Sequence, residues 1–312
     1  MIIIRTQEEQ GLIETHRVSK GCWIDARNVD KQDLDRMEHE FGIHGELLTD
    51  IMDADEQARI EKEVEYTALI VRLPVYDETS EVSFFTVPLG ILLFNDKIVT
   101  ICQRSSEALE DFSRNRIRGF SIRNKSSFVL NLMGRAAFTF LKSLKELNKR
   151  TNAIKDELQR SIKNNELIQL LSIQKSLVYF TTSITTNELL LEKLQKSPLI
   201  HFKEDEKDLL EDVVTENKQA IEMANIYSSI LTGTMDAFAS VISNNLNIVM
   251  NRLTVVSIVM MIPTLIYSFF GMNVNIPFQD SRSAVWGILV VSLLASILGA
   301  ILLNTGNRRK RM

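Results

Sequence analysis

The clearest hydrophobic pattern in the chain is a pair of long apolar segments near its end, residues 246–270 and 284–303. A helix that rises about 1.5 Å per residue needs about 20 residues to cross a hydrocarbon core of roughly 30 Å. Both segments reach that length, and the second contains no charged residue, which is rare in helices of soluble proteins. We therefore predict two transmembrane helices joined by a polar loop, residues 272–283.

A stripe that includes the first segment's polar residues runs along one helical face. Its members are spaced mostly three or four positions apart: Asn247, Met250, Leu253, Thr254, Ser257, Met261 and Thr264. The opposite face is aliphatic, suited to lipid or to the second helix: Ile248, Val255, Ile258, Val259, Ile262 and Ile266. Polar groups at membrane depth are costly unless they face protein or water. The stripe therefore either lines a path enclosed by an oligomer or supplies hydrogen bonds between packed helices.

Residues 204–270 contain no proline before Pro263, and an apolar seam with three- and four-residue steps runs through them. The seam comprises Leu210, Val213, Asn217, Ala220, Ala224, Tyr227, Leu231, Met235, Phe238 and Ile242. Such spacing is typical of helix bundles and coiled coils. We predict one stalk helix over residues 204–271, roughly 100 Å long at 1.5 Å per residue, whose last part, about 246–271, is the first membrane span.

A helical hairpin is predicted over residues 125–203. Its first helix, 126–163, shows apolar residues at helical spacing: Phe128, Leu132, Ala136, Phe140, Leu144 and Leu147. Asn164 and Asn165 would interrupt the helix, and a second helix over 166–196 would end before Pro198.

Residues 1–124 predict a mixed α/β domain, because short runs rich in Val, Ile, Phe and Tyr alternate with helical patterns. The expected strands are 2–5, 21–25, 59–63, 66–75, 82–88, 91–95 and 97–103. The expected helices are 31–41, capped by Asp30 and ended by Gly42, and 45–52. The fold class is thus an α/β sandwich with a long helical stalk and two transmembrane helices.

Charge and cysteine usage narrow the function and the compartment. The net charge of −4 without a dense basic patch argues against a nucleic acid partner. Cys22 and Cys102 are far apart, which fits a reducing compartment and excludes a disulfide framework. No phosphate-binding loop is present, and the four histidines form no ligand-spaced cluster, so we expect neither an enzyme nor an organic cofactor.

The orientation in the membrane follows from the basic residues. Four of them, residues 308–311, directly follow the second span, whereas the loop between the spans holds Arg282 alone. The positive-inside rule places this basic tail, residues 304–312, in the cytoplasm, and two crossings bring the N-terminal part to the same side. Residues 1–5 show no signal-peptide pattern. We expect a protein of the cell membrane with both termini in the cytoplasm.

Specific residues then point to a family. A long stalk helix, Pro263 and Thr264 in the first span, and Tyr267-x-x-Phe270-Gly271-Met272-Asn273 before a second span with a basic tail resemble the CorA family of magnesium channels. The Gly-Met-Asn triplet is the signature of that family. Two N-terminal segments, 23–25 and 41–51, also look like the family's pattern, so the resemblance covers essentially the whole chain.

The resemblance implies a homopentameric funnel that takes up Mg²⁺, and in relatives Co²⁺ or Ni²⁺, driven by the membrane potential. Gly271, Met272 and Asn273 would form the selectivity filter, with Asn273 as the outer ring. The stripe residues from Asn247 to Thr264 fall on the pore-lining positions of the family. This agreement favours the ion path over the packing interpretation of the stripe.

The resemblance also implies gating by cytosolic Mg²⁺ bound between subunits. Asp50 and Asp212 match the regulatory carboxylates of the family, while Asp53, Asp55 and Glu56 add negative charge nearby. Asp236 is a candidate for a further ring, and Asp280 is the one acidic residue of the outer loop. The alternatives are a Zn²⁺ transporter of the same superfamily and a membrane-anchored coiled-coil sensor that conducts no ions.

Overall fold

The computed structural model describes residues 1–8, 11–114, 121–160, 164–197, 199–200, 202–272 and 284–309. The chain divides into two compact units, Met1–Met235 and Asp236–Met312. The helix α6 (Glu204–Phe270) is continuous and contributes residues to both units; it extends over nearly the whole range 204–271 predicted for the stalk helix and the first apolar span.

The N-terminal unit is built on a seven-stranded mixed sheet with the strand order β2-β1-β3-β7-β6-β5-β4. The strands are β1 (Ile2–Glu8), β2 (Gly11–Thr15), β3 (Cys22–Arg27), β4 (Arg59–Lys62), β5 (Tyr66–Tyr76), β6 (Phe84–Phe94) and β7 (Lys97–Cys102). β3 and β7 pair in parallel, with Trp23 opposite Ile98, and the other neighbouring strands pair antiparallel.

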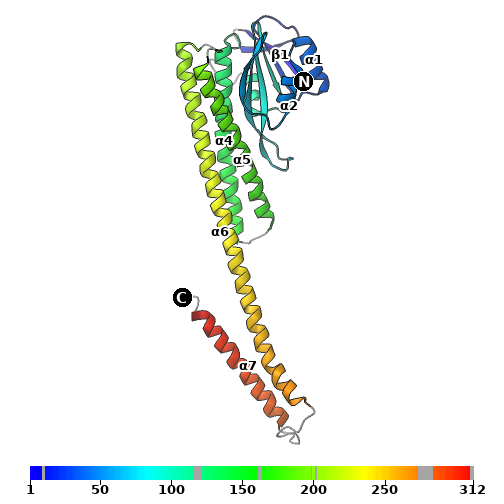
Figure 1. Ribbon diagram of the computed structural model, residues 1–312, viewed down its shortest axis with the longest axis vertical. Helices are drawn as coiled ribbons and strands as arrows, with labels where there is room; N and C mark the ends of the chain where they lie inside the picture. Colours follow the sequence, from blue (N-terminus) through cyan, green and yellow to red (C-terminus); the bar gives the residue numbers. More distant parts are fainter. Residues whose placement is uncertain are drawn as a thin grey trace. The chain divides into compact units, whose positions relative to one another are not determined.

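Helices cover both faces of this sheet (Figure 1). One face carries α1 (Lys31–Phe41) and α2 (Gly45–Met52). The other carries α3 (Glu107–Ser113), α4 (Lys125–Arg160), α5 (Asn164–Lys196) and the first part of α6. Successive strand residues enter different cores: Trp23 packs on the α4 side and Ile24 on the α1 side. The predicted sandwich is confirmed, and burial on both faces explains why β5 and β6 are almost uninterrupted apolar runs.

The ends of α1 lie where the sequence predicts them. The Asp30 side chain accepts a hydrogen bond from the Asp33 N–H, which caps the first turn. Gly42 adopts the left-handed conformation, with φ of 69°, and its N–H bonds to the Glu38 carbonyl. This stop leads directly into α2, the helix that carries Asp50.

In the N-terminal unit, the predicted seam of α6 is buried against the α4–α5 hairpin at Leu210, Val213, Asn217, Ala220, Ala224 and Leu231. The Asn217 amide donates to the Ile184 carbonyl on α5 at 3.1 Å. Asn187 of α5 in turn bonds both backbone groups of Arg72 in β5, at 2.8 and 2.9 Å. Both buried amides bond to backbone groups of a neighbouring element, so they help to fix the bundle on the sheet. Beyond Met235, the seam residue Phe238 is still buried, whereas Ile242 is exposed.

The structure corrects the sequence prediction at several elements. The strands expected over 82–88 and 91–95 are one strand, β6. Arg72, opposite Pro88, directs its N–H to Asn187, so the missing N–H of Pro88 interrupts no bond to β5. β2 and α3 were not predicted because both are short. α7 (Ala284–Arg309) continues beyond the predicted end at residue 303.

The C-terminal unit consists of the last part of α6 and α7. Both helices are long and apolar enough to cross a membrane. They run antiparallel, since Tyr267 contacts Ser292 and Ile262 approaches Gly299. Most of the aliphatic face of α6 is the partly buried side, at Ile248, Val255, Val259, Ile262 and Ile266, whereas Ile258 is exposed.

Candidate functional site

The polar stripe of α6 lies on its uncovered side. Each of its members is exposed in this chain: Asn247, Met250, Leu253, Thr254, Ser257, Met261 and Thr264. The Thr254, Ser257 and Thr264 hydroxyls each donate to the carbonyl four residues earlier on α6, at 2.9 Å. These bonds satisfy the hydroxyl protons without α7, and the oxygens keep lone pairs for a further donor. Within one chain, the stripe is therefore not the glue between the two helices.

The stripe leads to the first two residues of the Gly-Met-Asn triplet. The Gly271 N–H donates to the Tyr267 carbonyl at 2.9 Å and closes the last turn of α6. A Cβ on Gly271 would lie 3.2 Å from that carbonyl oxygen, so glycine suits this tight approach. Met272, half-exposed, lines a hollow of about 690 Å³ together with Met261 and Thr264. Asn273, Asp280 and Arg282 lie outside the described residues.

A contact between the membrane helices was missed by the sequence reasoning. The Tyr267 hydroxyl lies 2.9 Å from Ser292 Oγ, and Ser292 is 1% exposed. Ser292 and Ser296 are both buried, and a Cβ on Gly299 would lie 2.8 Å from Ile262 Cδ1. The four- and three-residue spacing of these small residues, typical of helix interfaces in membranes, was the available signal.

Asp50, the first candidate regulatory carboxylate, is paired within its own chain. Arg59 Nη2 donates to Asp50 Oδ2 at 2.6 Å and Arg59 Nε donates to Glu61 Oε1 at 2.6 Å. The same guanidinium contacts Glu56. Burial acts to lower the pKa of Arg59, but its hydrogen bonds to Glu61, Glu56 and Asp50 outweigh this and raise the pKa. We call these four residues the Arg59 cluster; three carboxylates share one cation there.

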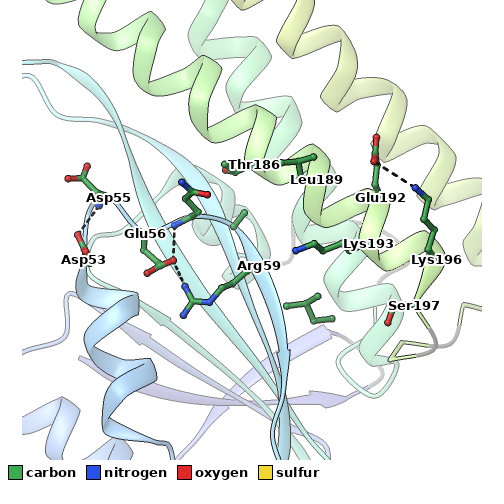
Figure 2. A pocket seen from close by; sticks show the side chains of 13 residues that line it. Asp53, Asp55, Glu56, Arg59, Thr186, Leu189, Glu192, Lys193, Lys196 and Ser197 are labelled. Carbon is green, nitrogen blue, oxygen red and sulfur yellow. Dashed lines mark hydrogen bonds and ion pairs between the residues drawn. The ribbon is translucent and has the colours of Figure 1, made fainter.

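The loop after α2 forms one wall of a cavity of about 870 Å³ against α5 (Figure 2). Asp53, Asp55 and Glu56 lie on the loop side. Lys193 and Lys196 extend from α5 on the other side. The lining is mixed in charge on both sides, because Arg59 lies beside the acidic residues of the loop and Glu192 pairs with Lys196 on α5 at 4.0 Å.

Asp212 lies on the exposed side of α6, one turn before Glu216. Burial, with the nearby charge of Asp212, raises the pKa of Glu216. Asp50 and Asp212 belong to elements on opposite faces of the sheet. Among the described residues, no group of three or more Asp, Glu, His or Cys side chains could hold a metal ion. A metal shared by Asp50 and Asp212 would therefore require two copies of the chain. Asp236 is also exposed.

The fold and the two apolar helices define a membrane protein with a mixed α/β domain and a helical stalk. The family model described as "CorA-like Mg2+ transporter protein" matches residues 19–310. The chain belongs to this family. The cobalt/magnesium transport protein CorA of Methanocaldococcus jannaschii is 24% identical over 281 residues, 88% of this chain and 87% of the relative. The protein of the same name from Thermotoga maritima is 21% identical over 314 residues, which cover 98% of this chain and 88% of the relative.

Structural similarity extends over almost the whole chain. The complete structure of the CorA magnesium transporter from Methanocaldococcus jannaschii matches with a TM-score of 0.80 at 21% identity. The match covers 97% of this chain and 96% of that one. The fold predicted from the sequence is therefore confirmed at the level of domain, stalk and two spanning helices.

Proposed function

We propose that the chain assembles as a homopentameric channel for Mg²⁺ uptake across the cell membrane. The observation that carries the proposal is the uncovered stripe of α6, which leads to Gly271-Met272-Asn273 in a chain of the Mg²⁺ transporter family. Only an oligomer can enclose this face, because α7 packs on the opposite one. Two relatives named as cobalt/magnesium transport proteins support Mg²⁺ and Co²⁺ as the permeant ions.

Asn273 would select the ion by holding its water. Mg²⁺ dehydrates reluctantly, so a filter that accepts hydrogen bonds from the hydrated ion avoids the cost of stripping it. Asn273 offers a neutral amide oxygen, which accepts such bonds without trapping the cation. Met272 is not proposed as a ligand, because a thioether is too soft for Mg²⁺.

The stripe would form the path below the filter. Asn247, Thr254, Ser257 and Thr264 offer oxygens to the hydrated ion, and each hydroxyl keeps lone pairs free for water. Met250 and Leu253 would narrow the path near the cytoplasmic end, where an apolar ring closes by losing its water. The membrane potential would drive uptake with about 4.6 kcal/mol per divalent ion at 100 mV. Both termini would lie in the cytoplasm.

Gating would depend on Mg²⁺ bound between Asp50 of one subunit and Asp212 of the next. Carboxylates on facing surfaces repel unless a cation lies between them. Loss of the ion at low cytosolic Mg²⁺ would separate the subunits and open the path. Asp236 and Asp280 are proposed as additional acidic positions along it.

Two other functions predict different results in the same experiment. Zn²⁺ prefers Cys and His ligands, and the stripe contains neither. A membrane anchor without conduction would need no polar stripe. The full-length chain in proteoliposomes, with an inside-negative potential and Mg²⁺, Co²⁺ or Zn²⁺ outside, separates the three. We expect potential-dependent Mg²⁺ uptake; faster Zn²⁺ uptake would favour a zinc transporter, and no uptake would favour the anchor.

A further inference from the structure

Tyr267 and Ser292 form a polar contact between two apolar helices. Their hydroxyl oxygens are 2.9 Å apart, and the Ser292 hydroxyl also donates to the Leu289 carbonyl of its own helix at 3.0 Å. Either hydroxyl can donate in this contact, because each carries one proton and accepts through its lone pairs. The bond therefore joins the Tyr267 hydroxyl on α6 to Ser292 Oγ on α7.

Tyr267 connects this contact to the end of α6. Its carbonyl accepts the hydrogen bond from the Gly271 N–H at 2.9 Å, and that bond closes the turn just before Met272 and Asn273. Tyr267 thus bonds to α7 through its side chain and to Gly271, the first residue of the Gly-Met-Asn triplet, through its backbone carbonyl. Rotation of α6 about its axis would move both together.

Close packing of α7 against α6 near Ser292 holds this residue in place. Gly299 lies two turns further along α7 and approaches Ile262 so closely that a Cβ would lie 2.8 Å from Ile262 Cδ1. Ser296 lies between them, is buried, and donates only to the Ser292 carbonyl, at 2.8 Å, among the bonds of the described chain. α7 thus presents small residues to α6. The Tyr267 side chain of α6 reaches α7, where its hydroxyl bonds to Ser292.

We propose that the hydrogen bond between Tyr267 and Ser292 fixes the rotation of the outer end of α6 and so positions the Asn273 filter. Tyr267 is a positioning residue: it acts on the permeant ion through the backbone of Gly271. This inference rests on the proposed channel function. Without the bond, the outer end of α6 adopts several orientations about its axis, and a smaller fraction of channels has every Asn273 amide in place. The apparent affinity for external Mg²⁺ is then the intrinsic affinity multiplied by that fraction.

The test uses the full-length chain in proteoliposomes, with Mg²⁺ uptake measured over a range of external concentrations. Tyr267→Phe and Ser292→Ala each remove one partner and keep the packing volume nearly unchanged. Ser296→Ala is the matched control, because it removes a buried hydroxyl of α7 that bonds within its own helix, to the Ser292 carbonyl. We expect KM to rise between about threefold and fifteenfold in either single variant, the range given by measured interhelical hydrogen bonds.

The double variant distinguishes one shared bond from two independent effects. If the bond is the cause, Tyr267→Phe with Ser292→Ala has the same KM as either single variant. Maximal uptake per assembled channel then changes less than KM, and Ser296→Ala behaves as the unaltered protein. An unchanged KM in Tyr267→Phe, multiplicative effects in the double variant, or an equal rise in Ser296→Ala would overturn the proposal. Absence of uptake in the unaltered protein would instead overturn the channel function itself.

Discussion

Arg59 holds Asp50 through a hydrogen bond of 2.6 Å between Nη2 and Oδ2, so the proposed regulatory carboxylate already has a cationic partner in its own chain. The two residues lie on β4 and α2, which are joined by the loop 53–58. Asp50 cannot offer the same oxygen fully to this guanidinium and to Mg²⁺. In the proposed channel, Arg59 and Mg²⁺ therefore compete for Asp50. The affinity of the regulatory site for Mg²⁺ is lowered by the free energy needed to release Asp50 from Arg59.

The first prediction concerns Arg59→Gln, which removes the competing cation. Asp50 then becomes more available to Mg²⁺, so less cytosolic Mg²⁺ should close the channel. We expect the half-closing concentration to fall about fivefold, which corresponds to about 1 kcal/mol for a partly exposed ion pair. Currents recorded from membrane patches at graded cytosolic Mg²⁺ measure this concentration.

Arg36→Gln is the control for this variant. Arg36 forms an exposed i,i+4 ion pair with Glu40 on α1, a different helix from the one that carries Asp50. It should leave the half-closing concentration unchanged. If Arg59→Gln raised that concentration instead, Arg59 would orient Asp50 for the metal rather than compete with it.

The second prediction tests the shared metal directly. Asp50→Ala combined with Asp212→Ala removes one carboxylate from each face of the subunit, and the channel should stay conducting at millimolar cytosolic Mg²⁺. The single variants should each weaken closure, because Mg²⁺ then lacks one of its two carboxylates. The same patch recordings provide the measurement, and block as strong as in the unaltered protein would contradict the proposed metal site.

The third prediction links the core of the sheet to this site. A Cβ on Gly90 of β6 would lie 2.8 Å from Ile51 Cγ1 and even closer to Ile51 Cδ1. Ile51 is completely buried next to Asp50 on α2. Gly90→Ala should therefore displace α2, with a loss of about 1–3 kcal/mol in stability and weaker closure by Mg²⁺.

Ile51→Val supplies the compensating variant, because it deletes the Cδ1 atom that meets the new methyl group. The double variant should regain part of the melting temperature and of the Mg²⁺ dependence that Gly90→Ala loses. Thermal unfolding of the purified full-length chain and patch recordings would test the two effects. If Gly90→Ala melted normally, the close packing of α2 on β6 would be in doubt.

Local patterns predicted the elements that depend on local physics. Asp30 and Gly42 determine the ends of α1 because a cap and a left-handed residue act within one turn. The seam from Leu210 to Leu231 predicted the stalk because its 3.6-residue period is set by burial along one helix. β6 was divided wrongly since Pro88 and Gly90 resemble a turn, and only the pairing of neighbouring strands shows that they fit one strand.

The contacts that define the candidate site could not be predicted in the same way. Arg59 reaches Asp50 because of the path of the chain between α2 and β4, which residue spacing does not determine. Tyr267 and Ser292 are 25 positions apart on two helices, and the apolar pattern of each helix hides which face meets the other. For Asp50 and Asp212, composition offered no signal above that of ordinary surface carboxylates, so their proposed role depended on the family resemblance.

The last prediction concerns the charge of the filter. Asn273→Ala removes the amide oxygen and should abolish most Mg²⁺ uptake, because a methyl group accepts no hydrogen bond from the hydrated ion. Asn273→Asp keeps the size but adds a negative charge at each position of the ring. Mg²⁺ should then bind more tightly and leave more slowly, so both KM and maximal uptake should fall. Uptake into proteoliposomes at graded external Mg²⁺ separates these two parameters. If Asn273→Ala transported Mg²⁺ normally, Asn273 would not be the filter residue, and the selective contact would have to lie deeper along the stripe, at Thr264 or Asn247.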